Sequence, residues 1–343
     1  MAHSHSLSVI GGSVSFSSDL GEIVGVSSQQ LPILKNLSIR RLTLAPGSIR
    51  EPHWHPNAVE LGYCIQGQAL VSVLGNADAF ANFTVAAGQM FYIPSGAIHH
   101  LENIGDDNAI FIIAFRHEAP EDFGFSGALG AMTDAVLGNT YDLPASAFEP
   151  FKRSTVSEQI VRRSGPAVVP VVALFDNPLK LDVEAQHPLL SNAAGEARFA
   201  RDQFWPVLKN ISMYSLRITN KGMREPHWHP ETAEMGYVHS GNARMTVLNP
   251  AGSTDTYLLS AGDMYFIPAA YPHHIEQVGY EPIHFLIFFD QPFPQDIGYR
   301  ATATAFSRPV LAATLGCDPE KLPQLPFTPI DPLIVNRINP RDP

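Results

Sequence analysis

Two stretches of the chain are nearly identical: residues 50–67 read REPHWHPNAVELGYCIQG, and residues 224–241 read REPHWHPETAEMGYVHSG. The offset is 174 positions (227 − 53 = 174), and it holds without a gap in both directions. Upstream, LPILKNLSI from residue 31 matches WPVLKNISM from residue 205; downstream, GQMFYIPSGAIHH from residue 88 matches GDMYFIPAAYPHH from residue 262. A duplicated unit of this length predicts two domains rather than a solenoid of short repeats. We place their boundary at Gly165-Pro166, which gives domains 1–165 and 166–343.

The composition narrows the classes of partner and of metal site. The 343 residues include 22 lysines and arginines against 33 aspartates and glutamates, a net charge of −11, so neither nucleic acid nor an anionic membrane is an expected partner. An apolar fraction of 45% with only 16% charged residues excludes intrinsic disorder. Two cysteines, Cys64 and Cys317, supply neither a disulfide framework nor a cysteine-rich zinc site, so any metal needs other ligands.

The N-terminal region bears on location. Residues 1–20 contain neither a basic segment nor the apolar run that marks a secretory signal. The longest apolar stretches, such as 110–115 and 285–289, are far shorter than the ~20 residues that a membrane span needs. We therefore expect a cytoplasmic protein, although an exported protein whose signal had been removed would look the same.

Within each copy the residue pattern is typical of short strands joined by turns. Segments such as 69–74, 90–93, 109–115 and 243–248 are rich in β-branched and aromatic residues and are bounded by Gly, Pro, Asn and Asp. Several such strands at close spacing favour an all-β sandwich or small barrel. Ala- and Leu-rich stretches at 128–137 and 301–315 predict short helical segments after the last strand of each copy.

Histidines mark a candidate site in each copy. Of 14 histidines, eight form four pairs at equivalent positions: His53/His55, His99/His100, His227/His229 and His273/His274. Two histidines separated by one residue on an extended strand point to the same face. Glu60 and His99 can reach that face from neighbouring strands, and three imidazoles with one carboxylate form a transition-metal site that water completes. The same spacing selects His227, His229, Glu234 and His273, and the doubling of the whole set argues against chance.

These residues resemble the two motifs of the cupin superfamily, G(x)5HxH(x)3-4E(x)6G and G(x)5PxG(x)2H(x)3N. The first copy fits at Gly47, His53, His55, Glu60, Gly67, Gly88, Pro94, Gly96, His99 and Asn103. In the second copy Lys221, Ala270 and Gln277 replace three motif residues, none of them a metal ligand. The resemblance covers nearly the entire chain and implies two tandem cupin barrels of the double-stranded β-helix or jelly-roll type. It also selects His99 and His273 as ligands over their neighbours His100 and His274.

Among two-barrel cupins, the chain resembles the oxalate decarboxylases, because the phrase Arg-Glu-x-His-Trp-His occurs in both copies. That resemblance implies one Mn²⁺ site in each barrel, O₂ as a cofactor, oxalate as the substrate, and a homo-oligomer that is trimeric or hexameric. It places Arg50 and Arg224 beside the metals, where a guanidinium and a divalent ion together neutralise a dicarboxylate. The alternative for each arginine is a structural pair with a carboxylate such as Glu51.

The proton donor of such a reaction is expected in the loop after the last strand of the first barrel. The bacterial enzymes of the resembled family carry Ser-Glu-Asn-Ser there, whereas residues 118–126 of this chain read EAPEDFGFS. Asp122 and the adjacent Glu121 come nearest in position and type. A turn or capping role is the alternative for Asp122, since the second copy repeats the Asp-x-Gly pattern at Asp296 and Gly298.

Three functions are compatible with these patterns. The first is a carboxy-lyase that converts oxalate to formate and CO₂; the second is an oxalate oxidase that produces CO₂ and H₂O₂. The third is a metal-binding bicupin or a dioxygenase that acts on another small acid, which Phe91 or Tyr265 facing the metal would favour. The missing Ser-Glu-Asn-Ser segment keeps the oxidase open, and the ligand set also suits iron, nickel, copper, cobalt or zinc.

Overall fold

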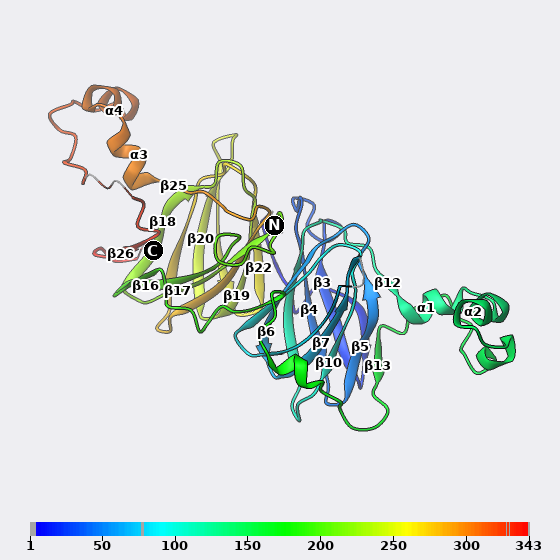
Figure 1. Ribbon diagram of the computed structural model, residues 1–343. Helices are drawn as coiled ribbons and strands as arrows, with labels where there is room; N and C mark the ends of the chain where they lie inside the picture. Colours follow the sequence, from blue (N-terminus) through cyan, green and yellow to red (C-terminus); the bar gives the residue numbers. More distant parts are fainter. Residues whose placement is uncertain (1–4, 77–78, 327, 329, 342–343) are drawn as a thin grey trace. The chain divides into compact units, whose positions relative to one another are not determined.

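The computed structural model describes residues 5–76, 79–326, 328 and 330–341. Contacts divide the chain into two compact units, each built from two β-sheets (Figure 1). The first barrel is Val9–Ala185, and the second barrel joins the N-terminal strand β1 (Ser6–Ser8) to the chain from Gln186 onward. The expectation of an all-β protein with two tandem barrels is confirmed.

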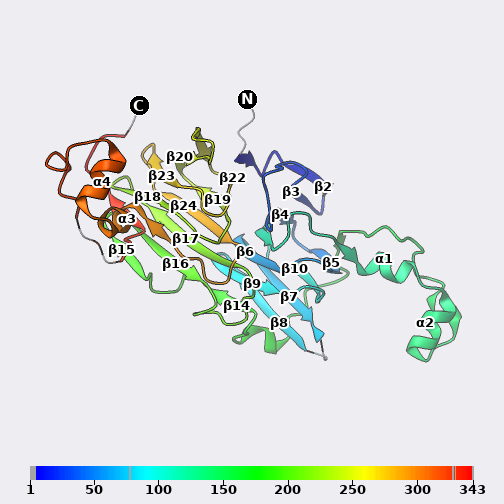
Figure 2. The same cartoon turned by 90° about the horizontal axis from the view of Figure 1, so that it is seen from above.

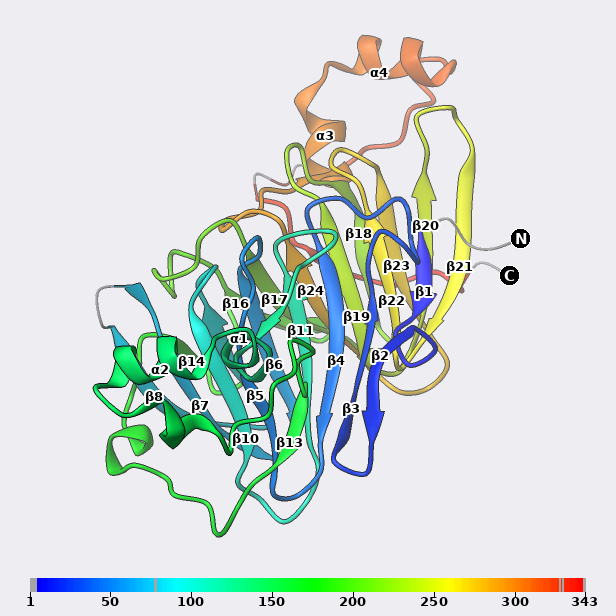
Figure 3. The ribbon, with the colours of Figure 1, turned by 90° about the vertical axis from the view of Figure 1, so that its right-hand side faces the viewer.

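The first barrel has sheets with strand orders β14-β9-β6-β11-β4-β3-β2 and β12-β5-β10-β7-β8, and β13 also pairs with β5. The first of these sheets consists of β2 (Ser13–Ser18), β3 (Gly21–Val26), β4 (Ser38–Leu44), β6 (Glu60–Gln66), β9 (Gln89–Ile93), β11 (Ala109–Phe115) and β14 (Lys180–Asp182). The second consists of β5 (Ser48–Trp54), β7 (Gln68–Leu74), β8 (Phe80–Ala86), β10 (Ile98–Asn103), β12 (Phe123–Gly124) and β13 (Ile160–Arg162). Figure 3 shows β2, β3 and β4 side by side.

The second barrel repeats this plan, with sheet orders β1-β22-β19-β24-β17-β16-β15 and β21-β20-β23-β18-β25. The first sheet adds to β1 the strands β15 (Leu190–Asn192), β16 (Gly195–Ala200), β17 (Ser212–Ile218), β19 (Glu234–Ser240), β22 (Asp263–Ile267) and β24 (Ile283–Phe289). The other contains β18 (Gly222–Trp228), β20 (Asn242–Leu248), β21 (Thr254–Ser260), β23 (His273–Val278) and β25 (Ile297–Gly298). A late strand, β26 (Ile334–Asn336), lies beside β18 (Figure 1).

The lead strand of each sequence copy belongs to the barrel of the other copy. Ser6 of β1 pairs with Tyr265 of β22, and Lys180 of β14 pairs with Phe91 of β9. The two pairs are equivalent in the repeat, because Lys180 lies 174 residues after Ser6 and Tyr265 lies 174 residues after Phe91 (6 + 174 = 180; 91 + 174 = 265). The exchange of lead strands between the two copies is therefore reciprocal. Because β14 still pairs within the first barrel, the chain changes unit at Ala185–Gln186, after the boundary near residue 165 that the sequence suggests.

Short helices follow β12 in the first barrel and β25 in the second, within the stretches that the sequence predicts, but each predicted stretch is interrupted. In the first barrel these are α1 (Phe125–Gly130) and α2 (Asp134–Tyr141), which project away from its sheets (Figure 2), and in the second they are α3 (Tyr299–Ala305) and α4 (Arg308–Leu315). Single 3₁₀ turns occur at Ala145–Phe148 and Val171–Leu174. Thr133 begins α2 because its hydroxyl accepts the Val136 backbone N–H at 3.2 Å, an N-cap that separates the two helices. In the part of the chain that the structure describes, no helix is both long and apolar enough to cross a membrane.

Large clusters of buried apolar side chains fill the two barrels, and the predicted metal ligands are buried among them. Buried side chains such as Val71, Phe83 and Phe111 fill the first barrel from both sheets. Strand register then places His53 of β5 directly opposite His99 of β10, and the register shifts between His99 and Leu101. The fold therefore brings the predicted ligands of the first copy to one place inside the barrel.

Candidate metal centres

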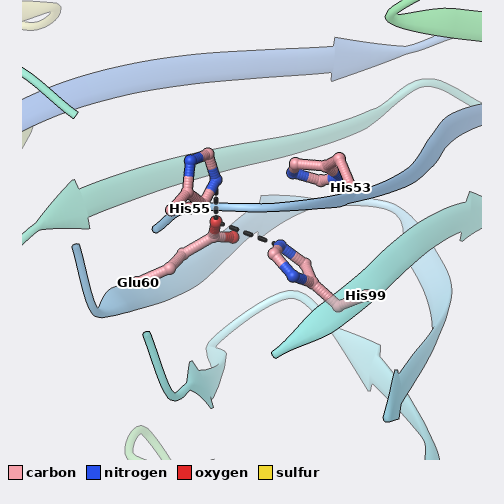
Figure 4. A group of neighbouring side chains, drawn as sticks. All are labelled: His53, His55, Glu60 and His99. Atoms are coloured by element: carbon pink, nitrogen blue, oxygen red, sulfur yellow. Dashed lines mark hydrogen bonds and ion pairs between the residues drawn. The ribbon is translucent and has the colours of Figure 1, made fainter. Parts of the chain in front are cut away.

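The first centre consists of His53, His55, Glu60 and His99, all buried (Figure 4). His53 lies on β5, His55 just after it, Glu60 opens β6, and His99 lies on β10. Glu60 Oε2 is 3.1 Å from His55 Nε2 and 3.2 Å from His99 Nε2, and the four potential ligand atoms lie within 4.8 Å of one another. The structure thus brings together all four residues that the sequence predicts.

The hydrogen bonds of the imidazoles determine which nitrogen faces the centre. The Nδ1–H groups of His53, His55 and His99 donate to the carbonyl oxygens of Glu51 (2.8 Å), Glu121 (2.8 Å) and Ala97 (3.0 Å). Since a carbonyl oxygen only accepts, Nδ1 carries the proton in each ring, and the Nε2 lone pair is left for the centre. Backbone partners of this kind orient metal-binding histidines in proteins.

The charge of the first centre also fits a metal cation. Burial alone would raise the pKa of Glu60, but His99 and His55 outweigh it and lower the pKa, so the carboxylate stays ionised. Burial, and then the charge of Arg50, holds the pKa of His53 well below its usual value, which keeps this imidazole neutral. Glu60 Oε1 has no hydrogen-bond partner among the described residues. Converging lone pairs and a buried carboxylate with an unpartnered oxygen are the donor set of a divalent transition metal.

The second centre repeats the arrangement with His227, His229, Glu234 and His273. Glu234 Oε2 lies 2.8 Å from His229 Nε2 and 3.3 Å from His273 Nε2, while His227 Nε2 has no hydrogen-bond partner in the described chain. Nδ1 of His227, His229 and His273 again lies 2.8–2.9 Å from a backbone carbonyl oxygen. The second set of predicted ligands is therefore also assembled.

The two centres differ in the groups around the carboxylates. The hydroxyl of Tyr265 donates to Glu234 Oε1 at 2.5 Å, whereas the first barrel has Phe91 at the equivalent position. In addition, Asp296 Oδ1 lies 2.8 Å from His229 Nδ1. Burial would lower the pKa of His229, but Asp296 and Glu234 raise it to about 10. A metal at this centre would therefore displace a proton from His229 as it binds.

Both predicted arginines lie beside the centres and pair with the aspartate of the following loop. Arg50 donates to Asp122 Oδ2 at 2.5 Å and to the carbonyl oxygen of Gln159 at 3.1 Å. In the second barrel Arg224 contacts Asp296 and donates to the carbonyl oxygen of Leu333 at 3.0 Å. Gln159 and Leu333 both have positive φ, 65° and 58°, a costly conformation for residues with a side chain. Strained backbone in the same place in both barrels aims a carbonyl at each arginine.

Glu51 has a structural role rather than pairing with Arg50. Its carboxylate accepts the backbone N–H groups of Ser126 (3.0 Å) and Gln159 (2.8 Å), so it fixes the segments on either side of the first centre. Gly124 passes so close that a Cβ there would lie 2.5 Å from Glu51 Oε1. The carboxylate that pairs with Arg50 is therefore Asp122. The sequence had suggested Asp122 as a candidate proton donor.

The two candidate proton donors are placed very differently. Glu121 is exposed, and its contribution to the first centre is its backbone carbonyl, which holds His55. Asp122 is only 14% exposed and accepts from both Arg50 and Arg40, the latter at 3.1 Å. Burial alone would raise the pKa of Asp122, but Arg50, His55 and Arg40 together lower it.

Arg40 is the residue at the first centre that the sequence motifs miss. It lies on β4, outside both motifs, and its position corresponds to Tyr214 in the second barrel (40 + 174 = 214). With Arg50, it lines a cavity of about 20 Å³ beside His53, His55 and Glu60. The rest of the lining is apolar: Ile23, Leu42, Leu101, Ile113 and Phe115. The mismatch between Arg40 and Tyr214 in the repeat was the one sequence signal that could have drawn attention to it.

The paired Asp122 carboxylate predicts a pH-dependent contribution to stability. A carboxyl group whose pKa is lower in the folded than in the unfolded state stabilises the fold above its unfolded pKa, and that contribution disappears as the pH falls through the folded pKa. Asp122→Asn should therefore lower the melting temperature at pH 7, and the difference from the unchanged protein should narrow below about pH 4. Thermal unfolding between pH 3 and 7 measures this, with the exposed Asp106→Asn as control. A difference independent of pH would show that Asp122 is not ionised in the fold.

Comparison with known proteins agrees with this geometry. The model of the Cupin family matches residues 10–147 and 181–322, one match in each copy. The chain belongs to the cupin family. It is 30% identical over 288 residues to oxalate decarboxylase OxdC of Bacillus subtilis, which covers 79% of this chain and 72% of that enzyme. It is also 30% identical over 262 residues to a probable oxalate decarboxylase of Arthroderma benhamiae, of which it spans 63%. It is 36% identical to oxalate oxidase 1 of Hordeum vulgare, but over only 87 residues, which cover 24% of this chain and 43% of that enzyme.

Solved structures show the same fold for this cupin. The structure of the Bacillus subtilis oxalate decarboxylase at pH 4.6 superposes with a TM-score of 0.85 and 24% identity, covering 98% of this chain and 88% of that one. Another structure of the enzyme served to assign the spectroscopic parameters of its Mn(II) centres. The chain is an oxalate decarboxylase-like bicupin, which confirms the resemblance and the enzyme class that the sequence predicts.

Proposed function

We propose that this bicupin is a manganese-dependent oxalate decarboxylase, which converts oxalate to formate and CO₂ with O₂ as redox cofactor at the first centre. The observation that carries the proposal is Arg50, a buried guanidinium that lines the same small cavity as His53, His55 and Glu60. In the structure Asp122 balances this buried charge, and a substrate carboxylate that replaced Asp122 would balance it in the same way. Similarity to oxalate decarboxylases over most of the chain supports the choice of anion.

The four ligands of each centre would hold Mn²⁺, which supplies the one-electron redox chemistry of the reaction when it is bound. A guanidinium can donate two parallel N–H groups to a carboxylate, and such a bidentate contact from Arg50 would fix the orientation of oxalate. The five apolar side chains around the cavity exclude water and thereby strengthen these charged contacts. The residues of the chain thus bind, orient and desolvate the substrate.

The cavity beside the first centre has a volume of about 20 Å³, which accommodates roughly one water molecule. Oxalate can therefore enter only by replacing a group that already contacts Arg50. The partner that a carboxylate can replace is Asp122, since both are anions that bind the Arg50 guanidinium. Asp122 would then lose the charge that contributes most to lowering its pKa, and the pKa would rise. Binding of oxalate therefore converts Asp122 from a counter-ion into a group that can hold a proton.

The proton balance of the reaction follows from this exchange. Hydrogen oxalate brings one proton, which passes to Asp122 when the substrate takes Arg50. The carbon–carbon bond breaks, one carbon leaves as CO₂, and the other receives the proton from Asp122 to become formate. The sum is one hydrogen oxalate ion converted to one formate ion and one CO₂. In this scheme Glu121 contributes only its backbone carbonyl to the first centre. That the Glu121 side chain donates the proton, as the sequence suggests, stays a prediction.

Arg50→Lys tests the proposed role of the guanidinium. Lysine keeps the charge but loses the planar fork, so we expect kcat/KM for oxalate to fall by about 10²-fold. Arg224→Lys makes the same change at the second centre and should leave kcat/KM within about threefold, because the reaction is assigned to the first centre. Steady-state kinetics of the manganese-loaded variants give both values. Turnover that is unchanged in Arg50→Lys would refute a bidentate clamp on the substrate.

The arrangement of Asp122 favours one alternative, an oxalate oxidase that forms two CO₂ and H₂O₂ from oxalate, O₂ and two protons. As long as Asp122 is ionised and paired with Arg50, it does not supply the proton that completes formate. If oxalate does not displace this pair, oxidation is the expected outcome. The ratio of formate to peroxide separates the two reactions.

The trimeric or hexameric assembly and the cytoplasmic location also stay predictions. Analytical ultracentrifugation can check the first and cell fractionation the second.

A further inference from the structure

A second, larger cavity lies in the first barrel next to the first centre. It has a volume of about 440 Å³, within the usual range of small-molecule sites. Most of its polar lining is uncharged and consists of Ser13, Ser15, Ser27, Gln29, Gln30 and Ser38. The charged lining residues are Arg40 and Glu121, and Glu121 is exposed, so solvent screens its repulsion of anions. We call this space the outer cavity, and the 20 Å³ space beside the ligands the inner cavity.

Arg40 connects the two cavities: within the described chain, it is the one residue that lines both. Its side chain is 22% exposed, and its Cζ atom lies 4.8 Å from the centre of the Phe115 ring, which belongs to the inner cavity. Arg40 and Arg50 both donate to the same oxygen, Asp122 Oδ2, at 3.1 and 2.5 Å. Two guanidinium groups that share one carboxylate are incompletely neutralised, so an arriving anion can bind them with little net loss of pairing.

The second barrel lacks this arrangement at the equivalent positions. Tyr214 stands in place of Arg40, and larger side chains stand in place of four lining residues: Phe199 for Gly25, Arg201 for Ser27, Phe204 for Gln30 and Phe293 for Ala119. The Arg201 guanidinium lies 4.8, 5.1 and 4.9 Å from the centres of the Phe199, Phe204 and Phe293 rings. In the second barrel, therefore, an arginine stacked among three aromatic rings occupies the region that is open in the first.

Gly25 shows why the small residues matter in the first barrel. A Cβ at this position would lie 3.1 Å from Arg40 Cγ and 3.0 Å from the Ile39 carbonyl oxygen. A side chain there, such as the phenylalanine of the second barrel, would crowd the Arg40 side chain. The glycine leaves the Arg40 side chain room on the side of the outer cavity.

We propose that the outer cavity is a binding site for small carboxylate anions, from which Arg40 passes the substrate to the inner cavity. Arg40 releases Asp122 and binds a carboxylate anion in the outer cavity. It then presents this anion to Arg50, which donates to the same oxygen of Asp122. Arg40 is thus a positioning residue. The identity of the anion as oxalate rests on the proposed function; the site itself rests on the cavity and on Arg40.

The test is a calorimetric titration of the manganese-loaded, full-length protein under nitrogen with oxalate, malonate, formate and succinate in turn. Arg40→Gln removes the charge and should weaken oxalate binding by about 10- to 100-fold, as expected for the loss of a hydrogen bond between charged groups. Arg41→Gln is the matched control, since Arg41 is the next residue of β4 and bonds Thr43 Oγ1 at 2.9 Å; its affinity should stay within about threefold. Ala119→Phe, which copies the second barrel, should also weaken binding although it leaves Arg40 in place.

Kinetics separate positioning from a structural role. If Arg40 delivers substrate, Arg40→Gln lowers kcat/KM by a larger factor than it lowers kcat, and Arg40→Lys restores part of the loss in kcat/KM. A fall of kcat and of the melting temperature, with unchanged oxalate affinity, would show instead that Arg40 only holds Asp122 and would overturn the proposal.

The titration also distinguishes this proposal from the proposed function. Equal oxalate affinity in the unchanged protein and Arg40→Gln would overturn the role of Arg40. If oxalate does not bind but another of the four acids binds in an Arg40-dependent way, the outer site is supported and oxalate decarboxylation is what fails. Arg40-independent binding of all four acids, or no binding of any, would refute the outer site.

Discussion

Glu60→Gln is expected to lower kcat for oxalate by about 10³-fold and to reduce the manganese content from two ions to one per chain. The amide has the shape of the carboxylate but no charge, and Glu60 is the one anionic ligand of the first centre. A bound metal is worth several kcal/mol to a reaction that develops negative charge, which corresponds to a loss of about 10³-fold in kcat. Elemental analysis and steady-state assays on the same preparation measure both quantities.

Glu234→Gln is the matched control, because it makes the same change at the second centre. It should also leave one manganese per chain, but turnover should largely persist, since the small cavity with Arg50 belongs to the first centre. Tyr265 can still bond the amide oxygen of the new residue, which helps the variant to fold. Two manganese ions per chain in Glu60→Gln would show that the ligand assignment is wrong, and the opposite pattern of activity would move the reaction to the second barrel.

Asp122→Asn is expected to stop the formation of formate and to divert the remaining turnover to CO₂ and H₂O₂. Asparagine can still accept an N–H group of Arg50, but it cannot hold and return the proton that formate needs. Loss of a general acid costs about 10²–10⁴-fold in the affected step. Formate and peroxide, both measured at a temperature well below the melting transition, give the partition between the two reactions.

Asp296→Asn provides the comparison for this variant, since Asp296 pairs with Arg224 in the second barrel as Asp122 pairs with Arg50 in the first. It should change neither the product ratio nor the rate of formate production by more than about threefold. Undiminished formate from Asp122→Asn would exclude Asp122 as the proton donor, and the exposed Glu121 would become the next residue to replace.

The two metal centres could be predicted from the sequence because their geometry is largely local. Two histidines one residue apart on a strand share a face, and an antiparallel partner strand places His99 opposite His53 and His273 opposite His227. The repeat at a fixed offset confirmed the pattern within a single chain. The family motif then identified which member of each later histidine pair belongs to the centre.

Features that depend on long-range packing could not be predicted in this way. The reciprocal exchange of β1 and β14 depends on which free sheet edge each short strand meets, and neither strand carries a signal for its partner. Arg40 lies 13 residues before His53 (53 − 40 = 13) and reaches the first centre only because β4 and β5 belong to the same barrel. The sequence likewise nominated Asp122 as an acid but gave no sign that two arginines would hold it ionised.

The measurement that tests the central claim most directly is the identification of products from ¹³C-labelled oxalate. The manganese-loaded protein is supplied with substrate under air at mildly acid pH, and products are followed by NMR with a parallel peroxide assay. Oxalate decarboxylation at the first centre predicts one formate and one CO₂ for each oxalate, with little peroxide. Peroxide with little formate would contradict it in favour of oxidation, and no turnover at full metal occupancy would contradict both.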